Sequence, residues 1–199
     1  MKKIAYFLIA LFFIVFVLCL AYYFFVVKRG VDFLPEKENN IVMQKDSITH
    51  KKMVDFSKTN QDFSFLAEIP EDFELEYIPQ LRAINIYNPH LNRESMREKS
   101  QIYISFFKAS KFLTLSTVEI TRQDKITIKD HEAVVYEITK KNGVPNFPGQ
   151  PNWRNFQHIA IDVRLNKDNP SYFYSFAQDP NFSQTVFEEF INSIVFTDK

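Results

Sequence analysis

The sequence predicts an α+β protein that begins with a membrane-spanning helix. The first observation is a run of 24 residues without a charge, an amide or a proline, from Ile4 to Val27. The second is an alternation of apolar and polar residues from Phe63 onward, which is typical of half-buried strands. The third is an apolar stripe between Val186 and Ile194, as in an amphipathic helix. We therefore expect a transmembrane helix, a central antiparallel sheet and a C-terminal helix packed on that sheet.

The apolar run is long enough to cross a bilayer. As a helix it would measure about 36 Å, against a hydrocarbon core of roughly 30 Å. A cleaved signal peptide is the alternative, with Cys19-Leu20-Ala21 as its small-residue site. The apolar part of such peptides is only about 7–15 residues long, and cleavage here would leave the strongly apolar segment 22–27 at the new N-terminus. We expect an uncleaved, single-pass anchor over residues 1–29 that contacts the lipid bilayer through Ile4 to Val27.

The basic residues that flank the run do not fix its orientation. Lys2 and Lys3 precede it, and Lys28 and Arg29 follow it. The positive-inside rule compares these two flanks, and their counts are equal. Because the leading tail is so short, we expect it inside the cell and the C-terminal domain outside the cytoplasm. No cysteine follows Cys19, so no disulfide is expected in that domain.

Composition excludes several functions for the rest of the chain. All four charges in the first 29 residues are positive, which leaves 20 basic and 24 acidic residues in the remainder. A domain with this negative balance is not expected to bind nucleic acid, which calls for basic patches. The chain has only three glycines, Gly30, Gly143 and Gly149, and their spacing cannot form a glycine-rich phosphate loop.

Residues 30–61 are polar and of mixed charge, and they predict a tether between membrane and domain. Apolar residues such as Val42, Met53 and Phe56 are too sparse there to form a core. The globular domain is expected over residues 62–199. It contains most of the 22 phenylalanines, and each buried ring removes roughly 150–250 Å² from water.

Strands are expected wherever apolar and polar residues alternate between turn signals. In one example, Phe73, Leu75 and Tyr77 alternate with polar residues and Pro79 ends the strand. The last two expected strands would pair as a hairpin, and Lys129-Asp130-His131 would form a tight turn. The expected strands are Phe63–Ile69, Phe73–Ile78, Arg82–Tyr87, Ile102–Phe106, Val118–Thr121, Lys125–Ile128, Ala133–Thr139, His158–Leu165 and Tyr172–Ala177.

The C-terminal helix carries its own start signals. Ser183 is placed to cap it, and Phe182 with Phe187 forms a hydrophobic staple. Its stripe of Val186, Phe187, Phe190, Ile191 and Ile194 predicts a face that packs on the sheet.

Three segments resemble the PsbP-like domain family. Residues 63–73 are similar to its opening strand, proline turn and aromatic residue, and 126–136 to its central hairpin. Residues 172–176 with 187–196 are similar to its closing strand and helix. The resemblance covers roughly residues 62–197, although Lys129-Asp130 departs from the Asn-Gly often found at the hairpin turn. It implies a three-layer α-β-α fold used as a binding or assembly module, as in membrane-tethered bacterial relatives of unknown role.

The sequence contains no evident catalytic motif. Its histidines, His50, His90, His131 and His158, have no partner at the spacing of metal ligands, so neither a metal nor a cofactor is expected. His158 and Asp162 would share one face of a strand, and they form a weak acid–base pair for which chance is the better explanation. We therefore expect no enzyme, with a tethered hydrolase or transferase as the alternative.

The segment 142–156 is the candidate partner-binding loop. It contains two glycines, three prolines and the only tryptophan. Tryptophan and arginine are enriched at binding hot spots, and a stiff loop loses less entropy on binding. The hypothesis is that Phe147, Trp153, Arg154 and Phe156 contact a protein or envelope ligand. In the alternative, Phe147, Trp153 and Phe156 fold back over one end of the sheet.

Overall fold

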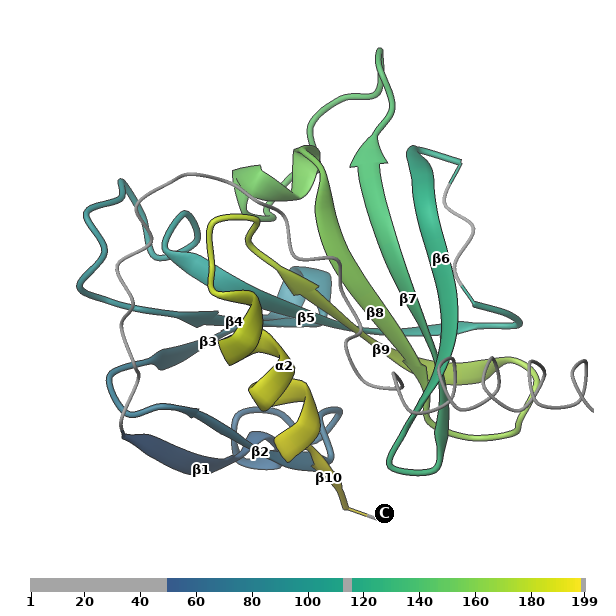
Figure 1. Cartoon of the computed structure of the whole chain (residues 1–199), viewed down its shortest axis with the longest axis horizontal. Helices are drawn as coiled ribbons and strands as arrows, with labels where there is room; N and C mark the ends of the chain where they lie inside the picture. Colours follow the sequence, from purple (N-terminus) through teal and green to yellow (C-terminus); the bar gives the residue numbers. More distant parts are fainter. Residues whose placement is uncertain (1–49, 113–115, 198–199) are drawn as a thin grey trace, which may run out of the picture. The chain divides into compact units, whose positions relative to one another are not determined.

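The computed structural model of the chain describes residues 50–112 and 116–197. In these ranges the protein consists mainly of strands, with one α-helix and three short 3₁₀ helices (Figure 1). The elements are β1 Lys51–Asp55, η1 Phe56–Lys58, β2 Phe65–Pro70, β3 Glu74–Ile78, η2 Pro79–Leu81, β4 Ala83–Tyr87, β5 Ser100–Ala109, β6 Val118–Ile128, β7 His131–Lys140, η3 Asn152–Asn155, β8 His158–Arg164, β9 Ser171–Gln178, α2 Gln184–Ser193 and β10 Val195–Phe196.

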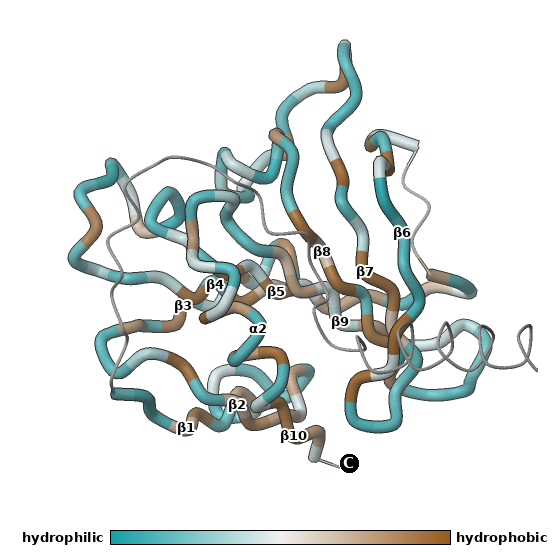
Figure 2. Tube along the Cα trace, viewed as in Figure 1, coloured by the Kyte–Doolittle hydropathy of each residue, from teal (hydrophilic) through white to brown (hydrophobic). Residues whose placement is uncertain are grey.

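The larger sheet has seven antiparallel strands in the order β3-β4-β5-β9-β8-β7-β6. Apolar residues gather along its strands, whereas the connecting loops are mostly hydrophilic (Figure 2). The expected hairpin between β8 and β9 is confirmed, with Asp162 opposite Ser175 and Ala160 opposite Ala177. Strands β3 and β6 form the two edges of this sheet.

One face of the larger sheet is covered by α2 and by a second sheet of order β1-β2-β10, and we call it the helix-bearing face. Aromatic rings join these layers. The Phe176 ring of β9 lies 5.8 Å from the Phe65 ring of β2 and 6.0 Å from the Phe190 ring of α2, centre to centre. The Ser183 side chain accepts a hydrogen bond from the Val186 N–H, so the predicted cap of the helix is confirmed.

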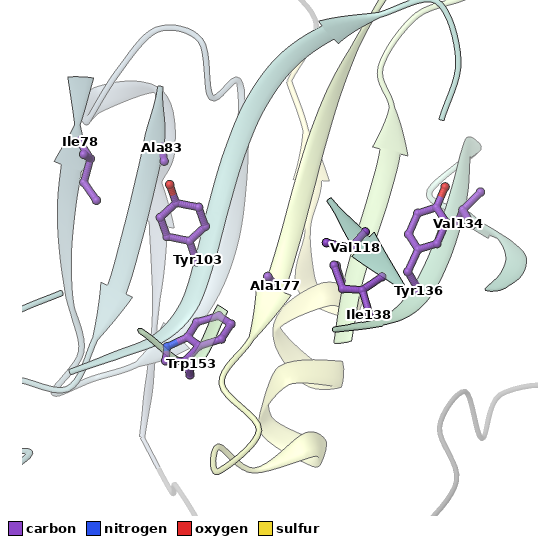
Figure 3. Close-up of a cluster of buried hydrophobic side chains, with 10 residues drawn as sticks. Ile78, Ala83, Tyr103, Val118, Val134, Tyr136, Ile138, Trp153 and Ala177 are labelled. Atoms are coloured by element: carbon purple, nitrogen blue, oxygen red, sulfur yellow. The ribbon is translucent and has the colours of Figure 1, made fainter. Parts of the chain in front are cut away.

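Loops cover the opposite face of the larger sheet, which we call the loop-bearing face. Because side chains alternate along a strand, Ser175 and Ala177 of β9 face the loops while Tyr174 and Phe176 face the helix. The loop-bearing face has its own apolar cluster (Figure 3), formed by Ile78, Ala83, Tyr103, Val118, Val134, Tyr136, Ile138, Trp153, Ala160 and Ala177.

The hairpin of β6 and β7 has two special features. Its two-residue turn, Lys129-Asp130, adopts positive φ angles of 46° and 69°, as a type I′ turn requires. A bulge then interrupts the β6–β7 pairing, because Ile120 lies opposite Ile138 and Arg122 opposite Glu137. Thr121 is the extra residue. We expected two strands in this segment, Val118–Thr121 and Lys125–Ile128. The structure has one strand, β6, which bends at the bulge.

The predicted three-layer α-β-α fold is wrong. The described residues form a mostly β structure of two antiparallel sheets with one short C-terminal helix. The segments on the loop-bearing face contain Pro89, Pro145, Pro148 and Pro151, and prolines interrupt helices, so loops stand where the resemblance implied helices. On the other face the added layer is mainly a sheet rather than a second helix.

The folded part begins earlier than we expected. Strand β1 pairs with β2, and the Phe56 side chain is fully buried, although both lie in the predicted tether 30–61. The predicted anchor, Ile4 to Val27, lies outside the described residues. Among residues 50–112 and 116–197, no helix is long and apolar enough to cross a membrane.

Candidate functional site

The connection between β7 and β8, residues 141–157, lies on the loop-bearing face and is called the Trp153 loop. Its short helix η3 places the Trp153 indole in the apolar cluster, where the side chain is 7% exposed. The indole Nε1 donates a hydrogen bond to the Ser100 carbonyl oxygen at 3.0 Å. Trp153 therefore joins the loop to strand β5 beside Tyr103 and Ala177 (Figure 3).

Hydrogen bonds hold the Trp153 loop in shape. The Phe147 N–H donates to the Asn155 side-chain oxygen at 3.0 Å, and the Asn155 amide donates to the Asn152 carbonyl at 3.0 Å. The Asn152 N–H also reaches the Glu98 carboxylate on the neighbouring loop at 3.2 Å. Gly149 has a φ of +74°, a conformation that favours glycine. The loop is therefore ordered by its own side chains and by one adjoining loop.

Phe156 is presented to solvent at the end of this loop. Its N–H donates to the Trp153 carbonyl at 3.0 Å. Its carbonyl accepts a hydrogen bond from His158 Nδ1 at 2.7 Å, because a carbonyl can only accept. The ring is nevertheless 60% exposed. The backbone is thus fixed on both sides while the aromatic side chain is free to meet another molecule.

Arg154 lies between the loop and the sheet. Its Nε donates to the Gln150 side-chain oxygen at 3.1 Å, and its guanidinium carbon is 5.3 Å from the centre of the Tyr103 ring. Burial lowers the pKa of Arg154, while the charges of Tyr103 and Asp162 act in the opposite direction. The Nη1 atom is buried and has no hydrogen-bond partner among the described residues.

A small cavity lies beside Arg154. Its volume is about 10 Å³, and its wall is formed by Val118, Ile120, Tyr136, Ile138, Arg154, Ala160 and Ser175. Burial, followed by the charge of Asp162, raises the pKa of Tyr136, so its hydroxyl keeps its proton. A space of this size holds about one water molecule, whereas small-molecule sites enclose roughly 300–1,000 Å³. The cavity can therefore accept one small polar group but not a substrate-sized molecule.

His158 and Asp162 share this face of β8, as the sequence predicted, but they do not meet. Four residues along a strand separate their Cα atoms by about 13 Å. Both side chains are buried, and Asp162 interacts electrostatically with Tyr136 and Arg154. Burial and, to a smaller extent, the Arg154 charge lower the pKa of His158 to about 3, so the imidazole stays neutral. The pair has no geometry for direct proton transfer.

The structure brings together residues that come from distant parts of the sequence. Tyr103, Tyr136 and Ser175 lie around Arg154 although each looked like an ordinary strand residue. Only the strand order β5-β9-β8-β7, which the sequence did not reveal, places them on one face. Of the four predicted contact residues, Phe156 is exposed, Phe147 and Arg154 are half-buried, and Trp153 is buried. Within the described ranges, no group of three or more acidic, histidine or cysteine side chains could hold a metal ion.

Comparisons with known proteins add little to this description. No family model matches the chain, and a search of curated proteins finds no match. Among solved structures, the chain is similar to a protein from Bacteroides thetaiotaomicron VPI-5482, with 14% sequence identity and a TM-score of 0.36. The match covers 69% of this chain and 47% of the other, so the chain spans about half the length of that relative. A similarity this low carries no argument, and the PsbP-like resemblance stays a prediction.

Proposed function

We propose that this chain is a membrane-anchored, extracytoplasmic binding or assembly module that holds a protein partner and performs no reaction. The observation that carries the proposal is Phe156, an exposed aromatic ring on a backbone held by Trp153 and His158. An aromatic side chain on a fixed backbone loses less conformational entropy when a partner covers it than one on a mobile loop. In this proposal Trp153 supports the loop from inside, and Phe156 contacts the partner.

A tethered hydrolase or transferase is the second candidate. It is favoured by the buried polar groups around the cavity, since shifted pKa values often mark functional sites. The cavity volume of about 10 Å³ and the separation of His158 from Asp162 support the binding module instead. A polar group of the partner could enter the cavity without any bond being made or broken.

The test of partner binding uses photocrosslinking in intact cells that express the full chain. A photoreactive amino acid at position 156 should capture a specific protein, and the same amino acid at position 195 should not. Val195 is the matched control because it is 51% exposed on the other sheet. Equal capture from both positions would contradict the proposal.

Substitutions separate contact from support. Phe156→Ala should abolish co-purification of the captured protein and change the melting temperature by no more than a few degrees. Trp153→Ala should instead destabilise the fold by about 3–5 kcal/mol, because it removes a buried aromatic side chain. If Phe156→Ala retains the partner, the loop is not the contact surface.

The anchor is tested separately. The full chain should remain in membranes washed with alkaline carbonate, whereas a chain without residues 1–29 should be released. Release of the full chain would contradict the membrane placement but would leave the role of Phe156 open to its own test.

A further inference from the structure

Strand β1 is an edge strand that presents a self-complementary surface. It pairs with β2 on one side, and among the described residues no strand pairs with its other side. At its centre Met53 is 54% exposed. An edge of this kind accepts an additional strand, provided that its free backbone groups and side chains match those of the incoming chain.

The hydrogen bonds of the β1–β2 ladder show which backbone groups of β1 are free. The Glu71 N–H donates to the His50 carbonyl at 3.1 Å, just before β1 begins. In an antiparallel ladder, residues that bond to the neighbouring strand alternate with residues that do not. Lys52 and Val54 therefore face β2, while the backbone groups of Lys51, Met53 and Asp55 point away from it. Opposite Lys51 stands Pro70, which has no N–H to offer and so fits this alternation.

The side chains of the same three residues lie on one face of the small sheet. Met53 is opposite Glu68, and Asp55 is opposite Leu66. Their neighbours on β2, Ala67 and Ile69, are fully buried, so residues 66 and 68 lie on the outer face. Lys51 and Asp55 thus stand on the outer face at the two ends of β1, with Met53 between them.

We propose that a second copy of this chain pairs with β1 in antiparallel orientation, with the two-fold axis at Met53. The two methionines then face each other, and Lys51 of each copy lies opposite Asp55 of the other. All three outward-facing residues form hydrogen-bonded pairs, and two attractive charge pairs form by symmetry. The smaller sheets of the two copies become one continuous six-stranded sheet, β10-β2-β1 followed by β1-β2-β10.

Other registers fit less well. Within β1, only residues 51, 53 and 55 have backbone groups that point away from β2, so the pairing can shift only by two residues at a time. Each such shift leaves one of the three residues without a partner in the other β1 strand. A shift of two residues also removes both attractive charge pairs, since Met53 then lies opposite Lys51 or Asp55 of the other copy. In the single chain Lys51 Nζ contacts Glu189 Oε2 at 2.9 Å and Asp55 accepts from the Ser57 N–H at 3.1 Å, and in the dimer the two side chains would exchange these partners for each other.

The expected dimer is weak. Two five-residue strands bury less than the roughly 1,000 Å² that a stable specific interface requires, so dimerisation should depend on concentration. It is separate from the proposed partner binding through Phe156, which lies in the Trp153 loop on the loop-bearing face of the larger sheet. Crosslinking of the full chain in its membrane is therefore the suitable assay, since it captures weak contacts.

The first test is a site-directed disulfide in isolated membranes treated with a mild oxidant. In a Cys19→Ser background, Met53→Cys should give a covalent dimer, because hydrogen-bonded antiparallel residues have Cα atoms about 5.5 Å apart, within disulfide range. Val195→Cys is the control, since Val195 is similarly exposed on the far edge of the same sheet. Equal dimer from both positions, no dimer from Met53→Cys, or its crosslinking to a different protein would overturn the proposal.

The second test uses charge. Lys51→Glu alone and Asp55→Lys alone each place like charges opposite each other, and each should lower the dimer yield of Met53→Cys about tenfold. A mixture of the two variants should restore it, because each lysine then meets an acidic residue on the other chain. Melting temperatures verify that both variants fold. Equal yields from the separate variants and from their mixture would contradict the predicted register.

Discussion

The ionisation of His158 departs far from its usual behaviour. It is buried beside the Trp153 ring, with the ring centres 5.5 Å apart. Its Nδ1 proton is donated to the Phe156 carbonyl, so Nε2 carries the lone pair and is buried without a hydrogen-bond partner among the described residues. Protonation would place a charge there without solvent, near the Arg154 guanidinium. The imidazole is therefore a neutral structural group that fixes the backbone of Phe156.

Stability should fall in acid because of this residue. Burial lowers the pKa of His158 to about 3 in the folded protein, whereas the unfolded chain has its ordinary value near 6.5. The unfolded state thus binds more protons between these values. Above about pH 6.5 His158 is neutral in both states and costs no stability. Between about pH 6.5 and pH 3 the free energy of unfolding should decrease by up to about 1.4 kcal/mol for each unit that the pH falls.

Urea unfolding at several pH values checks this prediction. His158→Gln should flatten the curve between pH 6 and pH 4, because glutamine does not titrate there. His90→Gln is the control, since it removes an exposed imidazole and keeps the buried His158. An unaltered slope in His158→Gln would assign the acid sensitivity to other groups.

Trp153 illustrates what the sequence settles about single residues and what it leaves open. Its loop was recognisable from prolines, glycines and aromatics, and that loop is ordered. Whether the indole faced inward depended on the Ser100 carbonyl, 53 residues earlier in the chain. No local pattern contains that information, because it arises only when β5 and β8 lie in the same sheet.

At the scale of elements, alternation identified strands well where one face is buried. Eight of the strands in the larger and smaller sheets, β2 to β9, coincide with segments that we expected from this pattern. Strand β1 was missed because Lys51 and Lys52 hide its few apolar residues. The bend in β6 was missed because a bulge changes the pairing without changing the composition. Local periodicity therefore finds strands, but pairing determines their ends and irregularities.

The β6–β7 turn carries conformational strain that a substitution can remove. Asp130 has a φ of 69°, a region that glycine adopts without steric cost. Asp130→Gly should raise the free energy of unfolding by about 0.5–1 kcal/mol. Lys167→Gly is the control, because this exposed residue has no positive φ and glycine there should be neutral or destabilising. Thermal unfolding of both variants makes the comparison, and a loss of stability in Asp130→Gly would show that no strain was relieved.

At the scale of the whole described fold, an ion pair with a buried carboxylate joins the loop before β5 to the segment between β9 and α2. Arg93 Nη1 donates to Asp179 Oδ2 at 2.8 Å and to the Glu98 carbonyl at 2.6 Å. The Asp179 side chain is only 1% exposed. The same loop contacts the Trp153 loop, because the Asn152 N–H donates to the Glu98 carboxylate. The loop before β5 therefore links the Trp153 loop to the segment that leads into α2.

Removing the cation should therefore affect the entire fold. Arg93→Met leaves the Asp179 carboxylate buried without its partner and should lower the free energy of unfolding by about 3 kcal/mol. Adding Asp179→Asn should recover part of this loss, because the charge is then gone. Arg82→Met is the surface control, and its pair with Asp62 should contribute less than about 1 kcal/mol. Equal losses from the Arg93 and Arg82 variants in urea unfolding would contradict a special role for the buried pair.

The layer arrangement was the part of the fold that the sequence misassigned. The C-terminal helix and the central antiparallel sheet were predicted from periodicity and are present. The third layer was an inference from resemblance, and the prolines of the intervening segments oppose it. The number of layers depends on which segments cover each face, and this is a long-range property that strand patterns do not contain.

Because of the bulge at Thr121, strand β6 contributes apolar side chains to the cores on both faces of the larger sheet. In the sequence, Val118, Ile120, Ile126 and Ile128 all occupy even positions and would line a single side of a regular strand. The extra residue reverses the alternation, so the first two residues wall the cavity beside Arg154 while the last two turn toward the helix. It also bends the outermost strand of the large sheet, and bent edges resist uncontrolled stacking with other chains. Deleting Thr121 would keep these side chains on their two faces, because Ile120 and Arg122 would then be neighbours in a regular strand. The deletion would nevertheless straighten edge strand β6 and favour aggregation through it.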